Sequence, residues 1–311
     1  MTGWLPGLPG VPSPGFRLLS GPGPTAICIE SDRIDECMAY YQEHGLSRIS
    51  VSPFLGFTGK DLDFLEHYPE VRGVWQSSDL GRIDITGLRF VESALEDLSV
   101  GDSHQALDLS RFPRLETFSS EWHPGLRITA ECTSLRRLSL SKYRPKSKNL
   151  TELAELPALE ELSLVQGPLR SIEGVGRFAR LTRLELAYLT KLDSVAAIEE
   201  LSGGRLEVLD CDVCKKIGDH ASVVRVPSLR VVKFNECGEI PSISFLDDMP
   251  QLEEFRFVDT NVIDGDLRPL LRLKSVGFFN KKHYSHTYEQ VDAVIRAARP
   301  TGSKAKGQVL G

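Results

Sequence analysis

The chain reads Leu135-Arg136-Arg137-Leu138-Ser139-Leu140, and the same Leu-x-x-Leu-x-Leu pattern returns at residues 159–164 and 181–186. Apolar residues at the first, fourth and sixth places define a unit that starts at residues 46, 71, 95, 115, 135, 159, 181, 206, 229, 252 and 273. The ten steps from residue 46 to residue 273 cover 227 residues, a mean of about 23. A fixed period in this range predicts a stack of similar units.

Each unit is predicted to join a short strand to a tight turn. The apolar fourth and sixth places alternate with polar neighbours, which is the period of a strand. The second half of a unit has apolar residues three apart, as at Leu150, Leu153 and Leu156, which fits a 3₁₀ or single helical turn. Proline ends several units at residues 113, 157, 227 and 250. The sequence therefore predicts an α/β solenoid of about eleven repeats.

These units resemble leucine-rich repeats, in particular the short repeats of bacterial internalin-like and phosphatase-regulator-like proteins. The resemblance covers residues 46–282. It implies a curved horseshoe with a parallel sheet on the concave side and 3₁₀ or short helices on the convex side. At the ninth place, where the family usually has Asn, this chain varies, with Leu189, Cys214 and Cys237 among the substitutes. The resemblance implies a fold and names no partner, because this scaffold serves many functions.

Segments of different composition flank the repeats. Residues 1–24 contain six Pro and six Gly, which predicts a disordered or loosely packed arm. Residues 25–45 are predicted to form an N-terminal cap, with a strand at 26–29 and a helix that begins after Ser31 and stops at Gly45. The pattern Thr287-x-x-Gln290 predicts a C-terminal cap helix within residues 283–299, followed by a flexible tail at 300–311.

Composition limits the partners and the compartment. A net charge of −6 argues against binding nucleic acid or an anionic membrane. The chain has no run of 18 apolar residues and no basic-then-apolar leader, so neither a membrane span nor standard secretion is expected. Six cysteines in 311 residues are too few for a disulfide framework. We expect a cytoplasmic monomer.

Two constellations invite a chemical interpretation. Cys211 and Cys214 form a C-x-x-C pattern, but Cys211 is at the inward sixth place and no second pair has the spacing of a zinc site. Core packing is therefore expected for both cysteines. His283 and His286 lie at the predicted junction with the C-terminal cap, where packing or capping is the favoured interpretation. Neither constellation predicts a cofactor, and we expect the protein not to be an enzyme.

Side chains on the outward face of the sheet are the candidates for binding a partner. The second, third, fifth, seventh and eighth places should point outward; the fifth is Ser at residues 99, 119, 139 and 163. Exposed aromatic side chains often anchor protein interfaces, and blocks of opposite charge set the register of a partner. The acidic block is expected at Glu96, Asp97, Asp102, Glu116 and Glu121. The candidate partner-binding residues are Trp75, Glu121, Trp122, Arg136, Arg137, Lys142, Tyr188, Asp210 and Asp212.

The sequence thus predicts a non-enzymatic module that binds a protein partner on its concave face, as a scaffold, a regulator or an immunity protein. Each aromatic candidate has an alternative place against a neighbouring loop. The alternative function is a catalytic or metal-dependent protein that uses His283 and His286 or the cysteines.

Overall fold

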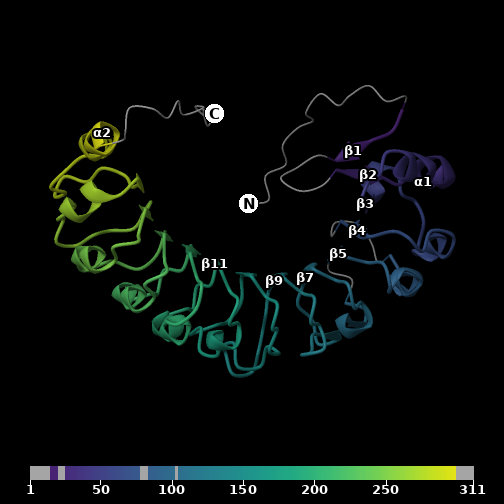
Figure 1. Ribbon diagram of the computed structural model, residues 1–311, viewed down its shortest axis with the longest axis horizontal. Helices are drawn as coiled ribbons and strands as arrows, with labels where there is room; N and C mark the ends of the chain where they lie inside the picture. The colour runs from purple at the N-terminus through teal and green to yellow at the C-terminus, as the bar shows by residue number, and fades with distance from the viewer. Residues whose placement is uncertain (1–14, 20–24, 78–82, 102–103, 299–311) are drawn as a thin grey trace. The chain divides into compact units, whose positions relative to one another are not determined.

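The computed structural model describes residues 15–19, 25–77, 83–101 and 104–298. The chain divides into two compact units. The first contains the chain up to Pro168 together with Arg177–Leu181, and the second contains Leu169–Gly176 and the chain from Thr182 onward. In each unit the strands lie side by side along one side of the repeats, and short 3₁₀ helices lie along the opposite side (Figure 1).

The first unit is built on one sheet whose strands follow chain order. The order is β1 (Leu18–Leu19), β2 (Ala26–Cys28), β3 (Arg48–Val51), β4 (Gly73–Gln76), β5 (Asp97–Val100), β7 (Thr117–Glu121), β9 (Arg137–Ser141) and β10 (Glu161–Val165). A separate parallel pair joins β6 (Leu107–Asp108) to β8 (Leu126–Arg127). The helices are α1 (Ile34–Glu43) and the 3₁₀ helices η1 (Pro53–Leu55), η2 (Asp63–His67), η3 (Thr86–Val91) and η4 (Leu109–Arg111).

The second unit repeats this plan. Its parallel strands are β11 (Arg183–Ala187), β12 (Val208–Asp212), β13 (Val231–Asn235), β14 (Glu254–Arg256) and β15 (Ser275–Gly277). Its helices are η6 (Ala196–Leu201), η7 (His220–Arg225), η8 (Ser244–Asp248), η9 (Arg268–Arg272) and the α-helix α2 (Tyr288–Ala298). A further turn, η5 (Val175–Arg177), lies in the stretch of sequence that is divided between the units.

Strand pairing confirms the predicted frame of the repeat. Within the first unit, Ser99 pairs with Ser119, Ser119 with Ser139, and Ser139 with Ser163, so that equal places of successive repeats stand side by side. Along β9, the fourth and sixth places, Leu138 and Leu140, are buried while their neighbours are partly or fully exposed. The core of each unit therefore consists of the inward apolar places, stacked from one repeat to the next.

Short polar side chains stabilise the turns on the side opposite the sheet. Asp108 accepts a hydrogen bond from the backbone N–H of Ser110, two residues further on, at 3.0 Å. Asn149 does the same for Thr151 at 3.1 Å. These bonds satisfy donors that a short turn leaves without an intrahelical partner. The spacing of apolar residues in the sequence does not predict these hydrogen bonds.

The segment predicted as an N-terminal cap contains β2 and α1, and this helix starts differently from the prediction. Residue Arg33, not Ser31, precedes α1, and the Ser31 hydroxyl accepts hydrogen bonds from the backbone N–H groups of Thr58 and Gly59. Ser31 therefore holds a neighbouring loop, because that loop offers two donors within its reach. Gly45 adopts φ +58° after the helix, as its predicted role as a stop requires.

Most of the predicted Pro/Gly-rich arm lies outside the described residues, as does the predicted tail at 300–311. Five residues of that arm, 15–19, are described and structured. Leu18–Leu19 forms β1 and pairs antiparallel with β2, and the ring of Phe16 lies 4.9 Å from that of Tyr40 on α1. Leu18–Leu19, within the predicted arm, thus adds a strand to β2.

Candidate protein-binding surface

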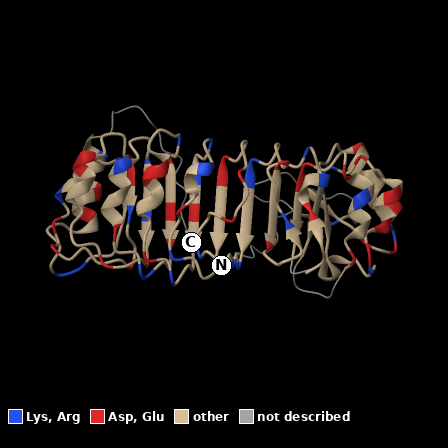
Figure 2. Ribbon diagram, turned by 90° about the horizontal axis from the view of Figure 1, so that it is seen from below, with Lys and Arg blue, Asp and Glu red and all other residues tan. Residues whose placement is uncertain are grey.

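The outward side chains of the strands define the surface that we call the sheet face. In the first unit, the fifth-place serines 99, 119, 139 and 163 are partly exposed and form one column across four strands. Because serine side chains are small, they leave the middle of the sheet face uncovered by bulky groups. Single charged residues, acidic on some strands and basic on others, stand among the uncharged residues of the parallel strands (Figure 2). The geometry of these charges decides what the face can bind.

Trp75 is held by two neighbours instead of standing free. Its indole Nε1 donates to Asp97 at 3.0 Å, and the Arg48 guanidinium lies 4.5 Å from the centre of its ring. Arg48 and Asp97 also form an ion pair in which both side chains are nearly buried. The sequence predicts Trp75 and Asp97 in solvent; the structure places Asp97 among the buried residues and Trp75 at intermediate exposure.

Most charges of the predicted acidic block, and the candidates Arg136 and Lys142, are paired with opposite charges of the same chain. Glu121 accepts from Lys142 at 2.7 Å, and Arg136 pairs with Glu160 at 2.6 Å. Glu96, at the second place of its repeat, pairs with Arg114 at 3.1 Å. Asp102 lies outside the described residues. The acidic block is therefore largely neutralised within the face, because neighbouring repeats bring opposite charges together.

Arg137 differs from its neighbour Arg136. Its Nε donates to the hydroxyl of Thr117 at 3.0 Å, and none of the carboxylates in the described residues forms an ion pair with it. The side chain is exposed. A guanidinium that is bound only to a hydroxyl keeps most of its donors for a carboxylate of another molecule.

Trp122 lies at the end of β7, at one edge of the sheet face. Its ring meets that of Tyr143 edge-on, with 6.0 Å between the ring centres and 83° between the planes. Trp122 is partly exposed, whereas Tyr143 is buried and its burial raises its pKa to about 12. A cavity of about 120 Å³ opens beside the two rings. Trp122 thus packs on a neighbouring repeat and keeps an exposed part.

The remaining predicted site residues belong to the second unit. Asp210 pairs with Lys233 at 2.7 Å. Asp212, two residues further along β12, has no ion pair within the described residues; burial, and then the charges of Asp210 and Glu236, raise the pKa of its carboxyl. Tyr188 follows β11 with φ +56° and is partly exposed. Asp210 and Asp212 stand on β12, and Tyr188 directly follows the neighbouring strand β11.

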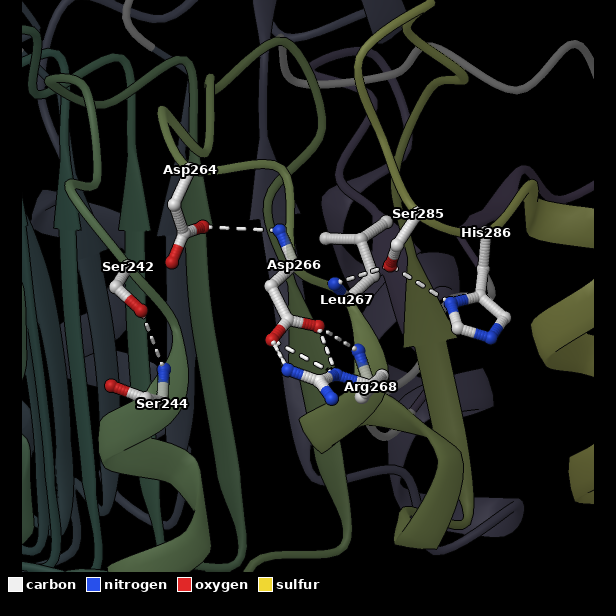
Figure 3. A network of polar contacts seen from close by, with 8 residues as sticks. All are labelled: Ser242, Ser244, Asp264, Asp266, Leu267, Arg268, Ser285 and His286. Atoms are coloured by element: carbon white, nitrogen blue, oxygen red, sulfur yellow. Dashed lines mark hydrogen bonds and ion pairs between the residues drawn. The ribbon is translucent and has the colours of Figure 1, made fainter.

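The two histidines of the C-terminal junction make contacts that suit a structural role. His283 Nε2 lies 2.9 Å from the carbonyl oxygen of Val262. His286 Nδ1 lies 2.9 Å from the hydroxyl of Ser285, which accepts from the backbone N–H of Leu267 (Figure 3). In the part of the chain that the structure describes, no three His, Cys, Asp or Glu residues are grouped so as to hold a metal ion.

Comparison with solved structures identifies the fold. An internalin, InlF from Listeria monocytogenes, matches with a TM-score of 0.50 over 76% of this chain and 68% of its own, at 13% identity. The functional domain of InlJ from Listeria monocytogenes matches with a TM-score of 0.34 over 68% of this chain and 54% of its own, at 14% identity. The chain has a leucine-rich repeat fold. No protein-family model and no curated protein matches the sequence.

At 13% identity the likeness to InlF concerns the leucine-rich repeat fold alone. The fold explains the cysteines at the ninth place of the repeat. Cys214 Sγ lies 3.3 Å from the carbonyl oxygen of Leu186, and Cys237 Sγ lies 3.5 Å from that of Cys211. Thr260 is at the same place of the next repeat, and its hydroxyl donates to the backbone carbonyl oxygen of Phe234 at 2.6 Å. Side chains at the ninth place thus bond backbone carbonyl groups of an earlier repeat, and the predicted burial of Cys211 and Cys214 is confirmed.

Sequence patterns miss several residues that shape the leucine-rich repeat surface. The Arg48 guanidinium packs on the ring of Trp75, and the ring of Tyr143 packs edge-on against Trp122. The loop Tyr143–Asn149 carries Arg144, Lys146 and Lys148 in alternation with other residues, a charge pattern visible in the sequence.

Among the described residues, no helix combines the length and the apolar character needed to cross a membrane.

Proposed function

We propose that this leucine-rich repeat protein is a binding module that holds a protein partner on its sheet face and catalyses no reaction itself. The observation that supports this most is the serine column of the first unit, residues 99, 119, 139 and 163, in register on a paired sheet and bordered by aromatic and charged side chains. Scaffolds, enzyme regulators and immunity proteins all require such a surface.

Rigidity favours this function. The strands that carry the column are joined by continuous backbone pairing, so their outward side chains keep one arrangement without a partner. A surface that is already ordered loses little conformational entropy on binding. Arg137 supplies a charge that the face itself leaves without a carboxylate.

We further propose that the protein acts as a monomer in a reducing compartment, the cytoplasm. The six cysteines support the reducing compartment, because all are free and buried, and a core that relies on thiols is compatible with reducing conditions.

Site-specific photo-crosslinking tests the proposed function. A photo-reactive amino acid at Ser139 or Ser163 should yield a covalent adduct with one protein in cells of the natural host. The matched control places the same residue at Arg180, an exposed position outside the strands. Adducts that form equally at Arg180, or form with many unrelated proteins, would contradict a specific partner on the sheet face.

A further inference from the structure

The loop Tyr143–Asn149 stands out in an acidic chain. It contains Arg144, Lys146 and Lys148 and no acidic residue, whereas the whole chain carries a net charge of −6. All three cations are exposed. Within the described residues none of them forms an ion pair, although most cations of the neighbouring strands do. The loop is therefore a local positive surface without ion pairs of its own among the described residues, although the charge of Lys146 acts on the carboxylate of Glu152.

The positive loop borders the cavity beside Trp122 and Tyr143. Pro145 of the loop lines this cavity together with both rings and the apolar side chain of Leu153. Its volume, about 120 Å³, is well below that of pockets for drug-sized ligands, about 300–1,000 Å³. A cavity of this size and lining fits one apolar side chain.

Hydrogen bonds hold the loop in one shape. The backbone N–H of Ser147 donates to the carboxylate of Glu152, and that of Lys148 donates to the carbonyl of Pro145 at 3.3 Å. Glu152 is the acidic residue that lines the cavity; the bond from Ser147 lowers its pKa, so it stays charged at neutral pH. Lys142, at the start of the loop, is already paired with Glu121. Three exposed cations thus face a single carboxylate that the backbone already holds.

We propose that this edge of the sheet face binds an acidic segment of the protein partner. One apolar side chain of that segment enters the cavity beside Trp122, and carboxylates before and after it pair with Arg144, Lys146 and Lys148. The inference rests on the proposed function and names the chemistry of the partner. A polyanion such as nucleic acid fits less well, because the rest of this acidic chain repels it and the cavity calls for an apolar group.

A peptide titration with the full chain tests the inference. The probe is the fluorescein-labelled peptide Glu-Asp-Glu-Leu-Asp-Glu, followed by anisotropy at low and physiological salt. Its comparison peptides replace the acids by Gln and Asn, or the Leu by Ser. A short oligothymidylate serves as a polyanion without an apolar anchor. We expect the acidic peptide to bind best and both replacements to weaken binding, the neutral peptide by about tenfold or more.

Matched variants locate the site. Arg144→Glu, Lys146→Glu and Lys148→Glu together should weaken peptide binding by about tenfold or more. The control combines Lys60→Glu, Arg177→Glu and Arg180→Glu, which changes the net charge equally at exposed cations elsewhere in the first unit. Trp122→Ala should also weaken binding, and Trp122→Phe should restore part of it. Thermal unfolding of each variant verifies that it is folded.

Three results would overturn the inference: no binding of the acidic peptide, equal binding of the neutral peptide or the oligothymidylate, or equal losses in the loop variant and the control variant. The crosslinks from Ser139 and Ser163 test the proposed function separately. A partner that is crosslinked from these positions and still binds the loop variant normally would leave the proposed function standing and remove only this site.

Discussion

Arg48 on β3 reaches past Gly73 on β4 and pairs with Asp97 on β5, so one ion pair joins strands that are not neighbours in the sheet. The glycine allows this crossing, since a Cβ at residue 73 would lie 2.5 Å from Cγ of Arg48. Trp75 covers the guanidinium and bonds the same carboxylate. A charged pair that the sheet and an indole shield from water behaves as part of the core.

Removing one partner of this pair should be costly. Asp97→Ala leaves the guanidinium of Arg48 nearly buried without its carboxylate, and we expect a loss of about 3–5 kcal/mol in the free energy of unfolding. The double variant Arg48→Met with Asp97→Leu removes both charges and should lose much less. Urea unfolding compares wild type with the two variants; a double variant that loses as much as Asp97→Ala would mean that the pair is not coupled.

The frame of the repeat predicts a large effect at Leu162. This fourth-place residue is 1% exposed, and Leu162→Ala should lower the free energy of unfolding by about 2–5 kcal/mol, because it opens a cavity between stacked repeats. Ser163→Ala, at the adjacent outward place, is the control and should change stability little. An unchanged denaturation midpoint for Leu162→Ala would show that the inward place is wrongly assigned.

His220 should make the protein sensitive to acid. It is 2% exposed, packs edge-on against Phe234, and burial lowers its pKa to about 4 from 6.5. As the pH falls below 6.5, His220 becomes protonated in the unfolded chain. In the folded chain it stays neutral down to about pH 4. Stability should therefore fall across this window, by up to about 3 kcal/mol from this group.

Unfolding measured against pH with wild type and His220→Leu isolates this effect. The variant should show a shallower loss of stability between pH 6.5 and pH 4, while both proteins share the later loss as carboxyls such as Asp266, with a pKa of about 2, become protonated. Parallel curves for the two proteins over the upper window would rule out His220 as the cause.

The N-terminal arm should divide into a dispensable part and a structural part. Deletion of residues 1–14 should leave the melting temperature unchanged. Deletion of residues 1–19 also removes β1 and the contact of Phe16 with Tyr40, and should lower it, because the edge of β2 is then exposed. Thermal unfolding followed by circular dichroism compares the two; equal melting temperatures would show that β1 adds no stability.

Arg137 should influence how fast a partner associates. Arg137→Glu reverses a charge that contacts only the hydroxyl of Thr117, so we expect slower association, a changed dependence on salt and little change in stability. Arg136→Glu is a less clean change, since it also breaks the pair with Glu160. Surface plasmon resonance with the crosslinked partner gives the rates; an unaltered association rate would place the partner's charges elsewhere.

Period alone was enough to predict which apolar strand residues are buried. Leu138 and Leu140 lie inward because a strand alternates its faces, and equal places stack because every repeat has nearly the same length. The burial of Cys211 and the capping pair of Thr287 with Gln290 also follow from local position. These features depend on neighbours within one repeat or on the same place in the next, and both are visible in the sequence.

Only the tertiary structure decides which outward side chains are free. Arg136 and Arg137 are adjacent and alike in sequence, yet the first is paired with Glu160 and the second meets only Thr117. Trp75 is held by Arg48 and Asp97, residues that lie one repeat away on either side. Such pairings depend on side-chain reach and on the size of the residue between the partners. The period of the sequence predicts which face of the sheet each side chain occupies. Which side chains contact one another depends on how the paired strands place them next to each other.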